Sequence, residues 1–80
     1  MRGLMVADHL LSRVQQEVYK NPSRAVREVH VRVGRYAFAD IGELTSAWGL
    51  IVKDTPFAAA RLVVTEADGR ECTFTKVVFD

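Results

Sequence analysis

The fold is decided by residues 26–33, which read Val26-Arg27-Glu28-Val29-His30-Val31-Arg32-Val33. Valines at positions 29, 31 and 33 alternate with polar residues at 28, 30 and 32. This period of two predicts a β-strand that buries one face and turns the other to water. Gly34 ends the strand. The valine face of the strand needs a covering layer to keep it from water.

Two helices are expected to supply that cover. Residues 4–20 predict an amphipathic helix that stops at Asn21-Pro22, because proline cannot donate its amide. Its apolar stripe is Leu4, Ala7, Leu10, Leu11, Val14 and Val18. A second helix begins near Asp40, where Asp40 and Glu43 form an Asp-x-x-Glu capping box, and ends at Asp54-Thr55-Pro56. Its buried stripe is Ile41, Leu44, Ala47, Trp48 and Ile51.

Residues 60–66 and 70–79 predict a hairpin around Ala67-Asp68-Gly69. A two-residue turn would set Glu66 opposite Glu71, whereas a three-residue loop pairs Glu66 with Arg70 and is favoured. The favoured register turns Leu62, Val64, Cys72, Phe74 and Val78 toward the helices. The order helix, strand, helix, strand, strand predicts an α+β domain over residues 1–80, with two helices on one face of a small three-stranded sheet.

That register leaves Val63, Val77 and Phe79 on the uncovered face of the sheet. Two interpretations stay open. The three side chains form an interface with a partner or with a second copy of the chain. Otherwise they are scattered singly, or a bulge turns Phe79 inward, and no patch exists.

Composition narrows the class of protein. No apolar run approaches the ~20 residues of a membrane helix, so no membrane partner is expected. A single cysteine, Cys72, excludes an internal disulfide framework and a multi-cysteine zinc site, and predicts a cytoplasmic setting. Residues 1–39 hold seven Lys/Arg and three acids, whereas residues 40–80 hold four and seven. Either the first half meets an anionic partner or the two halves neutralise each other.

The sequence offers no catalytic constellation. Cys72 is expected in the core, and nothing places His9 or His30 beside it, so no enzyme is predicted. Arg13, one helical turn after His9, would repel a cation bound there. A nucleic-acid surface would use Arg24, Arg27, Arg32 and Arg35, with Tyr36 and Phe38 for stacking, but the isoelectric point near 7.9 disfavours it.

The layout resembles the nickel-incorporation accessory proteins of hydrogenase maturation, the HypA/HybF family. Arg27 to Gly34 is similar to the family's basic-Val-x-x-Val-x-Val-x-(Ile/Val)-Gly strand, Glu43 to Trp48 to its second helix, and Asp54 to Leu62 to the stretch that follows. Cys72 to Phe79 resembles the final strand. The resemblance implies an accessory protein that is not an enzyme.

Two departures alter what the resemblance implies about metals. Family members open with Met-His-Glu and bind nickel through the amine, the histidine and nearby backbone nitrogens, whereas this chain opens Met1-Arg2-Gly3. A guanidinium has no lone pair for nickel. The family's zinc domain, with two Cys-x-x-Cys pairs, is inserted after the strand ending near Ala67, and only Cys72 is present here. The resemblance therefore implies the family fold without a tight metal site or cofactor.

The expected function is protein–protein contact during maturation of a metalloenzyme. The resemblance favours a nickel–iron hydrogenase as that enzyme. The partner would be a maturation protein or a metalloenzyme subunit, bound by the first helix through Arg2, Asp8, His9, Ser12 and Arg13. One alternative is a weak nickel metallochaperone that uses the Met1 amine and His9. Another is a small nucleic-acid binder that uses the basic first half.

Overall fold

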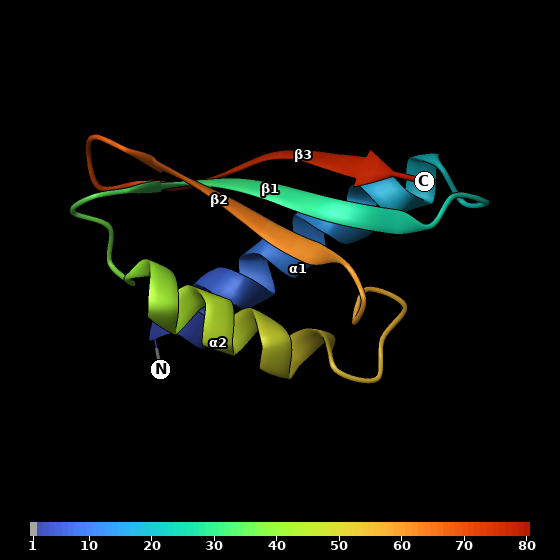
Figure 1. The fold of residues 1–80 in the computed structure, drawn as a ribbon, viewed down its shortest axis with the longest axis horizontal. Coiled ribbons are helices and arrows are strands. Elements are labelled where there is room, and N and C mark those ends of the chain that lie inside the picture. Colours follow the sequence, from blue (N-terminus) through green and yellow to red (C-terminus); the bar gives the residue numbers. More distant parts are fainter. Residues whose placement is uncertain (1) are drawn as a thin grey trace.

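The computed structural model describes residues 2–80 and contains two helices and three strands. In chain order these are α1 (Arg2–Lys20), β1 (Val26–Gly34), α2 (Ile41–Val52), β2 (Arg61–Ala67) and β3 (Cys72–Phe79). Both helices lie on the same side of the sheet, and the other side is uncovered (Figure 1). The predicted α+β class and the one-sided helical layer are therefore confirmed. No helix of residues 2–80 is both long and apolar enough to span a membrane.

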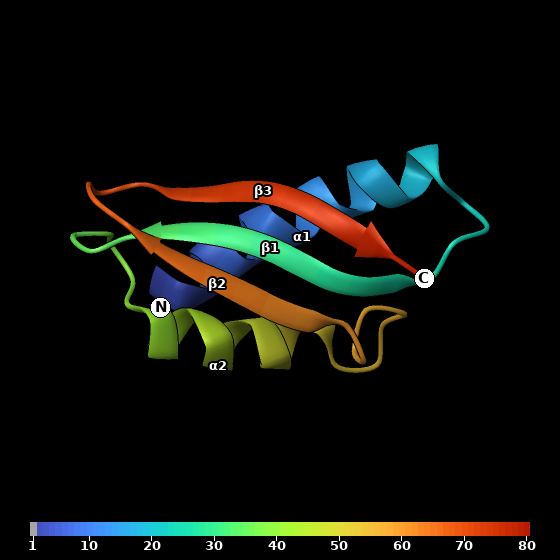
Figure 2. The same cartoon turned by 45° about the horizontal axis from the view of Figure 1, so that its top comes forward.

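The sheet has the order β2-β1-β3, so the predicted hairpin is wrong. β1 lies between the other two strands (Figure 2), parallel to β2 and antiparallel to β3. Since α2 carries the chain back to the start of β1, β2 runs in the same direction as β1, as in any β-helix-β crossover. Glu66 therefore faces Val33 and forms an ion pair with Arg35, at 3.6 Å, rather than with Arg70.

The β2–β3 connection crosses the end of β1 at very short range. A Cβ on Gly34 would lie 2.4 Å from the carbonyl oxygen of Gly69, so only glycine fits at position 34. Three backbone amides of residues 34–36 donate to carbonyl oxygens of residues 67–71. Gly69 has a φ of 99°, which favours glycine at the turn. The crossing thus fixes the β1–α2 loop against the β2–β3 loop.

The core lies between the valine face of β1 and the two helices. Val29, Val31 and Val33 are buried there, as the alternation predicts. α1 contributes Ala7, Leu10 and Val14, and α2 contributes Leu44, Ala47, Trp48 and Val52. Two positions of the predicted α2 stripe differ, because Ile41 in the first turn is exposed and Ile51 is only half-buried, while Val52 takes the buried place.

The pairing of β3 with β1 shifts between His30 and Val31, and this irregularity corrects the predicted faces of β3. Cys72 and Phe74 pack against the core as predicted, but the extra residue then brings Val77 to the core side. Val78 lies opposite Glu28, on the uncovered face. Of the two interpretations left open, the apolar patch of Val63, Val77 and Phe79 is therefore not formed.

Candidate functional site

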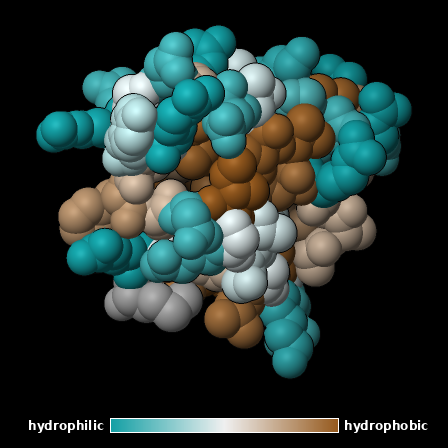
Figure 3. All heavy atoms as spheres, turned by 60° about the vertical axis from the view of Figure 1, so that its left-hand side comes forward, coloured by the Kyte–Doolittle hydropathy of each residue, from teal (hydrophilic) through white to brown (hydrophobic). Residues whose placement is uncertain are grey.

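The start of α1 and two loops form one exposed surface at an end of the molecule. We call it the N-terminal surface, and it consists of Arg2, Met5, His9, Tyr36, Phe38 and Arg70. Met5, Tyr36 and Phe38 are 70%, 71% and 65% exposed, which is high for large apolar side chains. Met5, His9, Phe38 and Arg70 line one surface cavity, and Tyr36, Phe38 and Arg70 line the next. Figure 3 views the molecule from the side of these loops and shows hydrophobic atoms gathered among hydrophilic ones.

The β1–α2 loop presents Phe38 because its neighbours point inward. Ala39 is buried and Ala37 packs partly against the core, so the side chain between them faces outward. The Arg2 guanidinium lies 4.4 Å from the centroid of the Phe38 ring. Such a cation–π contact at an exposed site contributes about 0.5–1 kcal/mol. It joins the first turn of α1 to the loop.

The first turn of α1 is also tied to α2. The amide of Gly3 donates to Oε2 of Glu43 at 3.0 Å. Only half of the predicted capping box is present, because Asp40 Oδ1 accepts from the Glu43 amide at 2.7 Å while the Glu43 carboxylate turns to α1 instead. A carboxylate at the first turn satisfies a free amide and the positive end of the helix dipole. Gly3 itself is buried against Glu43.

The groove between α1 and β3 brings His9 and Cys72 to the walls of the same two cavities. The expectation that nothing places them together is therefore wrong, because α1 crosses β3 at the end where Cys72 lies. Burial raises the pKa of the Cys72 thiol, so it stays neutral and is a poor nucleophile or metal ligand. Arg13, whose guanidinium lies 5.2 Å from the Phe74 ring centroid, lines one of these cavities and adds positive charge.

The five predicted partner-binding residues are all exposed on α1, but they do not form one cluster. Arg2 and His9 belong to the N-terminal surface, and Arg13 continues it along β3. Ser12 lines a separate cavity with Tyr19 and Lys20, and Asp8 lines none of these cavities. Sequence reasoning missed Met5, although it lies between Arg2 and His9 at helical spacing.

In residues 2–80 the side chains that commonly bind metals are not gathered at one place. No group of three or more His, Cys, Asp or Glu side chains in residues 2–80 is arranged to hold a metal ion. His9 lies seven residues after Arg2, which is about 10 Å along a helix axis. The other candidate, the Met1 amine, lies outside the described residues.

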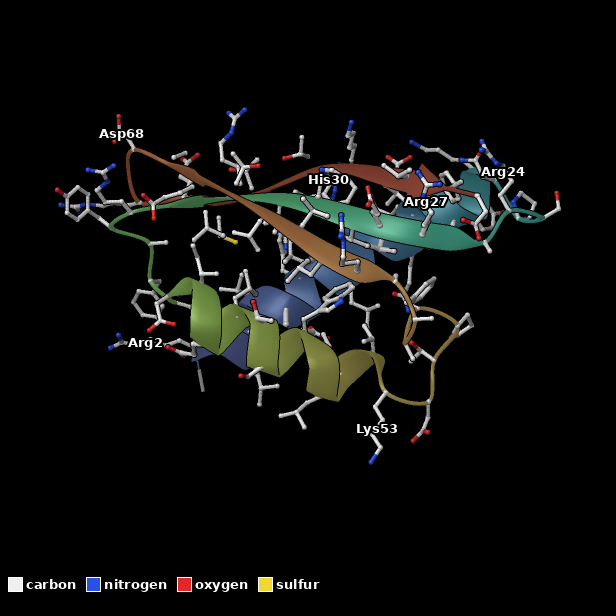
Figure 4. All side chains as sticks on the ribbon, in the orientation of Figure 1. Arg2, Arg24, Arg27, His30, Lys53 and Asp68 are labelled. Carbon is white, nitrogen blue, oxygen red and sulfur yellow. The ribbon has the colours of Figure 1, made fainter. Side chains whose placement is uncertain are left out.

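The residues of the nucleic-acid hypothesis are not brought together. Arg24 precedes β1 and Tyr36 follows it, so the length of the strand, about 30 Å, separates the basic end from the aromatic side chains. Arg35 is engaged by carboxylates, at 3.6 Å from Glu66 and 3.8 Å from Asp68. Figure 4 shows Arg24 and Arg27 on the side of the sheet away from the helices.

Comparison with known proteins decides the family. Residues 1–76 match the family model described as hydrogenase/urease nickel incorporation, metallochaperone, HypA. The chain belongs to the HypA family. It is a family of metallochaperones and not of enzymes, so a non-enzymatic role in hydrogenase or urease nickel incorporation is the function this membership supports.

The fold of this HypA-family chain has been seen in a solved structure. The solution structure of the Ni metallochaperone HypA from Helicobacter pylori superposes with a TM-score of 0.69 at 13% sequence identity. The match covers 96% of this chain and 85% of the Helicobacter pylori chain, so nearly the whole of this chain shares that fold. None of the curated proteins compared with the chain matches it.

Proposed function

We propose that this HypA-family chain is a cytoplasmic accessory protein that acts by contact with a maturation protein or a metalloenzyme subunit, and that it has no tight nickel site of its own. The target enzyme is a nickel–iron hydrogenase or a urease. The contact is made by the N-terminal surface, with Phe38 and Met5 as its apolar centre.

One observation carries the proposal: the two positions that the family resemblance assigns to nickel have structural roles here. The Arg2 side chain lies on the Phe38 ring, and the Gly3 amide donates to the Glu43 carboxylate. To bind nickel, the Gly3 nitrogen would have to give up its hydrogen and this hydrogen bond. Arg2 offers no lone pair in exchange.

The exposure of the apolar residues supports the choice of surface. Six large hydrophobic side chains are exposed in residues 2–80. Of these, Phe38 lines one cavity with Met5 and another with Tyr36. Large exposed apolar residues that adjoin one another mark interfaces, and arginine and aromatic residues are enriched there. Arg2 and Arg70 at its margin would favour a partner with carboxylates around an apolar pocket.

Binding to the hydrogenase or urease maturation proteins and subunits of the same organism tests the proposal. We expect Phe38→Ser to weaken the complex at least tenfold by isothermal titration calorimetry, and Leu50→Ser to leave it unchanged. Leu50 is 64% exposed on α2 and lines none of the cavities of the N-terminal surface, so it is a matched control. Equal affinities of both variants for the partner would contradict the proposed surface.

Equilibrium dialysis of the untagged chain against nickel tests the second half of the proposal. We expect less than one equivalent at low micromolar nickel, with the Helicobacter pylori protein as the positive control. One bound equivalent would instead favour the weak-metallochaperone alternative, with Met1 and His9 as the first residues to substitute.

A further inference from the structure

The uncovered face of the sheet carries an uneven set of charges. Residues of β1 at positions 28, 30 and 32 lie on this face, because the alternating valines lie on the other. Cross-strand register adds Arg61, Val63 and Thr65 from β2, and Thr73, Lys76 and Val78 from β3. Arg27 lies on the same side of the sheet in Figure 4, and Arg24 lies near the end of the sheet where β1 begins. We call this the basic sheet face.

Four cations of this face, Arg27, Arg32, Arg61 and Lys76, meet a single carboxylate. That carboxylate, Glu28, is already engaged, with Arg61 at 2.9 Å and His30 at 3.0 Å. The other ion pairs of residues 2–80 join Lys20 to Glu17, and Arg35 to Glu66 and Asp68, and none of them involves a cation of this face. The neutralisation of the two halves that composition leaves open therefore does not happen on this face.

Three of the cations have no ionic partner within residues 2–80. Arg32 lies opposite Thr65 on one side and Thr73 on the other, and Lys76 lies opposite His30. No carboxylate forms an ion pair with Arg27, Arg32 or Lys76 in the described part of the chain. These three side chains are therefore free to pair with carboxylates of another molecule, and an oppositely charged partner gains by covering them.

We propose that the basic sheet face is a second docking surface, which binds an acidic surface of a partner protein. It is separate from the N-terminal surface and goes beyond the proposed function. The complementary charge would come from Asp and Glu side chains, for which the fixed forks of Arg27 and Arg32 are suited. Thr65 and Thr73 beside Arg32 add hydroxyl donors.

A protein partner fits this face better than a nucleic acid does. Binding of single strands needs exposed aromatic side chains for stacking, and Tyr36 and Phe38 lie at the end of the molecule beyond β1. Phe79 is half-buried, and the Arg24 guanidinium lies 5.0 Å from its ring centroid. Small β-branched side chains at positions 63, 65, 73 and 78 instead give a flat surface.

A fluorescent twelve-residue polyglutamate peptide is the first probe, measured by anisotropy at low and at 0.2 M salt. We expect salt-sensitive binding that weakens at least fivefold in Arg32→Glu and in Lys76→Glu. Lys53→Glu makes the same charge change in the α2–β2 loop, on the helical side of the molecule (Figure 4), and is expected to bind as the wild type does. Circular dichroism melting confirms that each variant is folded.

Three results would overturn the proposal. The first is an equal loss of peptide binding in Lys53→Glu, which would indicate net charge rather than this face. The second is tighter binding of a twelve-nucleotide oligouridine than of the peptide, which would assign the face to nucleic acid. The third is concentration-dependent self-association that Arg32→Glu abolishes in sedimentation, which would make a second copy the occupant. Chemical-shift changes confined to the three strands on peptide addition would support the proposal.

Discussion

Gly3 shows how one residue couples the two helices. A Cβ at this position would lie 2.8 Å from the backbone oxygen and 3.0 Å from Cγ of Glu43. Backbone cannot move aside cheaply, so the missing side chain allows the close approach of α1 and α2. The same closeness allows the Gly3 amide to reach the Glu43 carboxylate.

We expect Gly3→Ala to destabilise the protein by about 1–3 kcal/mol, as overpacking does. Helix propensity alone predicts the opposite sign, because alanine is favoured over glycine by about 1 kcal/mol in a helix. Gly49→Ala is the matched control, since a Cβ there meets nothing within 4 Å, and it should be neutral or stabilising. Urea unfolding measures both. A stabilised Gly3→Ala would show that the helices are not in close contact.

Glu28 links stability to pH. The hydrogen bond from His30, and then the charge of Arg61, lower the pKa of the Glu28 carboxyl below its ordinary value. A lowered pKa means that the folded state binds the proton less readily than the unfolded chain does. The stabilisation is therefore present above the ordinary glutamate pKa of about 4.3 and is lost as the pH falls below it.

The expected result is that Glu28→Gln is less stable than the wild type at pH 7 and that the difference shrinks toward pH 3. Urea unfolding of both proteins at the two pH values measures this. Glu66→Gln is the control, because the ion pair of Glu66 with Arg35 is long and exposed. Its stability should differ little from that of the wild type at either pH. If the difference in free energy of unfolding between the wild type and Glu28→Gln grew toward pH 3, it would contradict the stabilisation of the Glu28 carboxylate by His30 and Arg61.

At the scale of elements, α2 depends on Trp48. The side chain is 3% exposed in the core, as its place on the helical stripe predicts. Its indole Nε1 is buried and donates to none of the described residues. Trp48 thus contributes packing volume and carries a buried polar group without a protein partner.

We expect Trp48→Ala to cost about 3–5 kcal/mol, a large share of the roughly 5–10 kcal/mol that stabilises a small domain. Trp48→Phe keeps most of the apolar volume and removes the N–H, so its cost should stay below about 1.5 kcal/mol. Thermal melting compares the two variants. Similar melting temperatures for both would mean that the side chain is not packed in the core.

Local patterns predicted the helices and β1, but they could not predict which strands pair. The alternation in residues 26–33 and the Asp40 cap depend on neighbours in sequence. Pairing of β2 and β3 depends on β1, more than 25 residues away. A short connection favours a hairpin locally, yet four residues can also span the ~9.6 Å between two edge strands with a third between them. β1 takes the central position in the sheet because its three valines are buried in the core.

The same limit applies to the candidate site at the scale of the whole molecule. Arg2, His9 and Arg13 could be predicted because they share the exposed side of one helix. Phe38 and Arg70 could not, because they come from two loops that meet only where the β2–β3 connection crosses the end of β1. The fold stays similar to that of a nickel metallochaperone at 13% identity, while Arg2 and Gly3 take structural roles.

Nickel should leave the stability of the whole molecule unchanged. A ligand at 100 times its Kd stabilises the folded state by about 2.7 kcal/mol, which for a domain of this size raises Tm by more than about 10 °C. We expect 100 µM nickel, or EDTA, to shift Tm by less than about 1 °C. Differential scanning calorimetry measures this, with the Helicobacter pylori protein as the comparison. A large shift with nickel would contradict the absence of a tight site.

The central position of β1 has a consequence for synthesis on the ribosome. β1 is complete at Gly34, but the strand for its second edge begins only at Cys72. At about 5–20 residues per second, translation of the stretch between them takes roughly 2–8 seconds. During those seconds the valine-rich strand has at least one unpaired edge, the condition under which nascent chains aggregate. α1, which is made before β1, is the first element available to shield its valines, and α2 follows within the same interval.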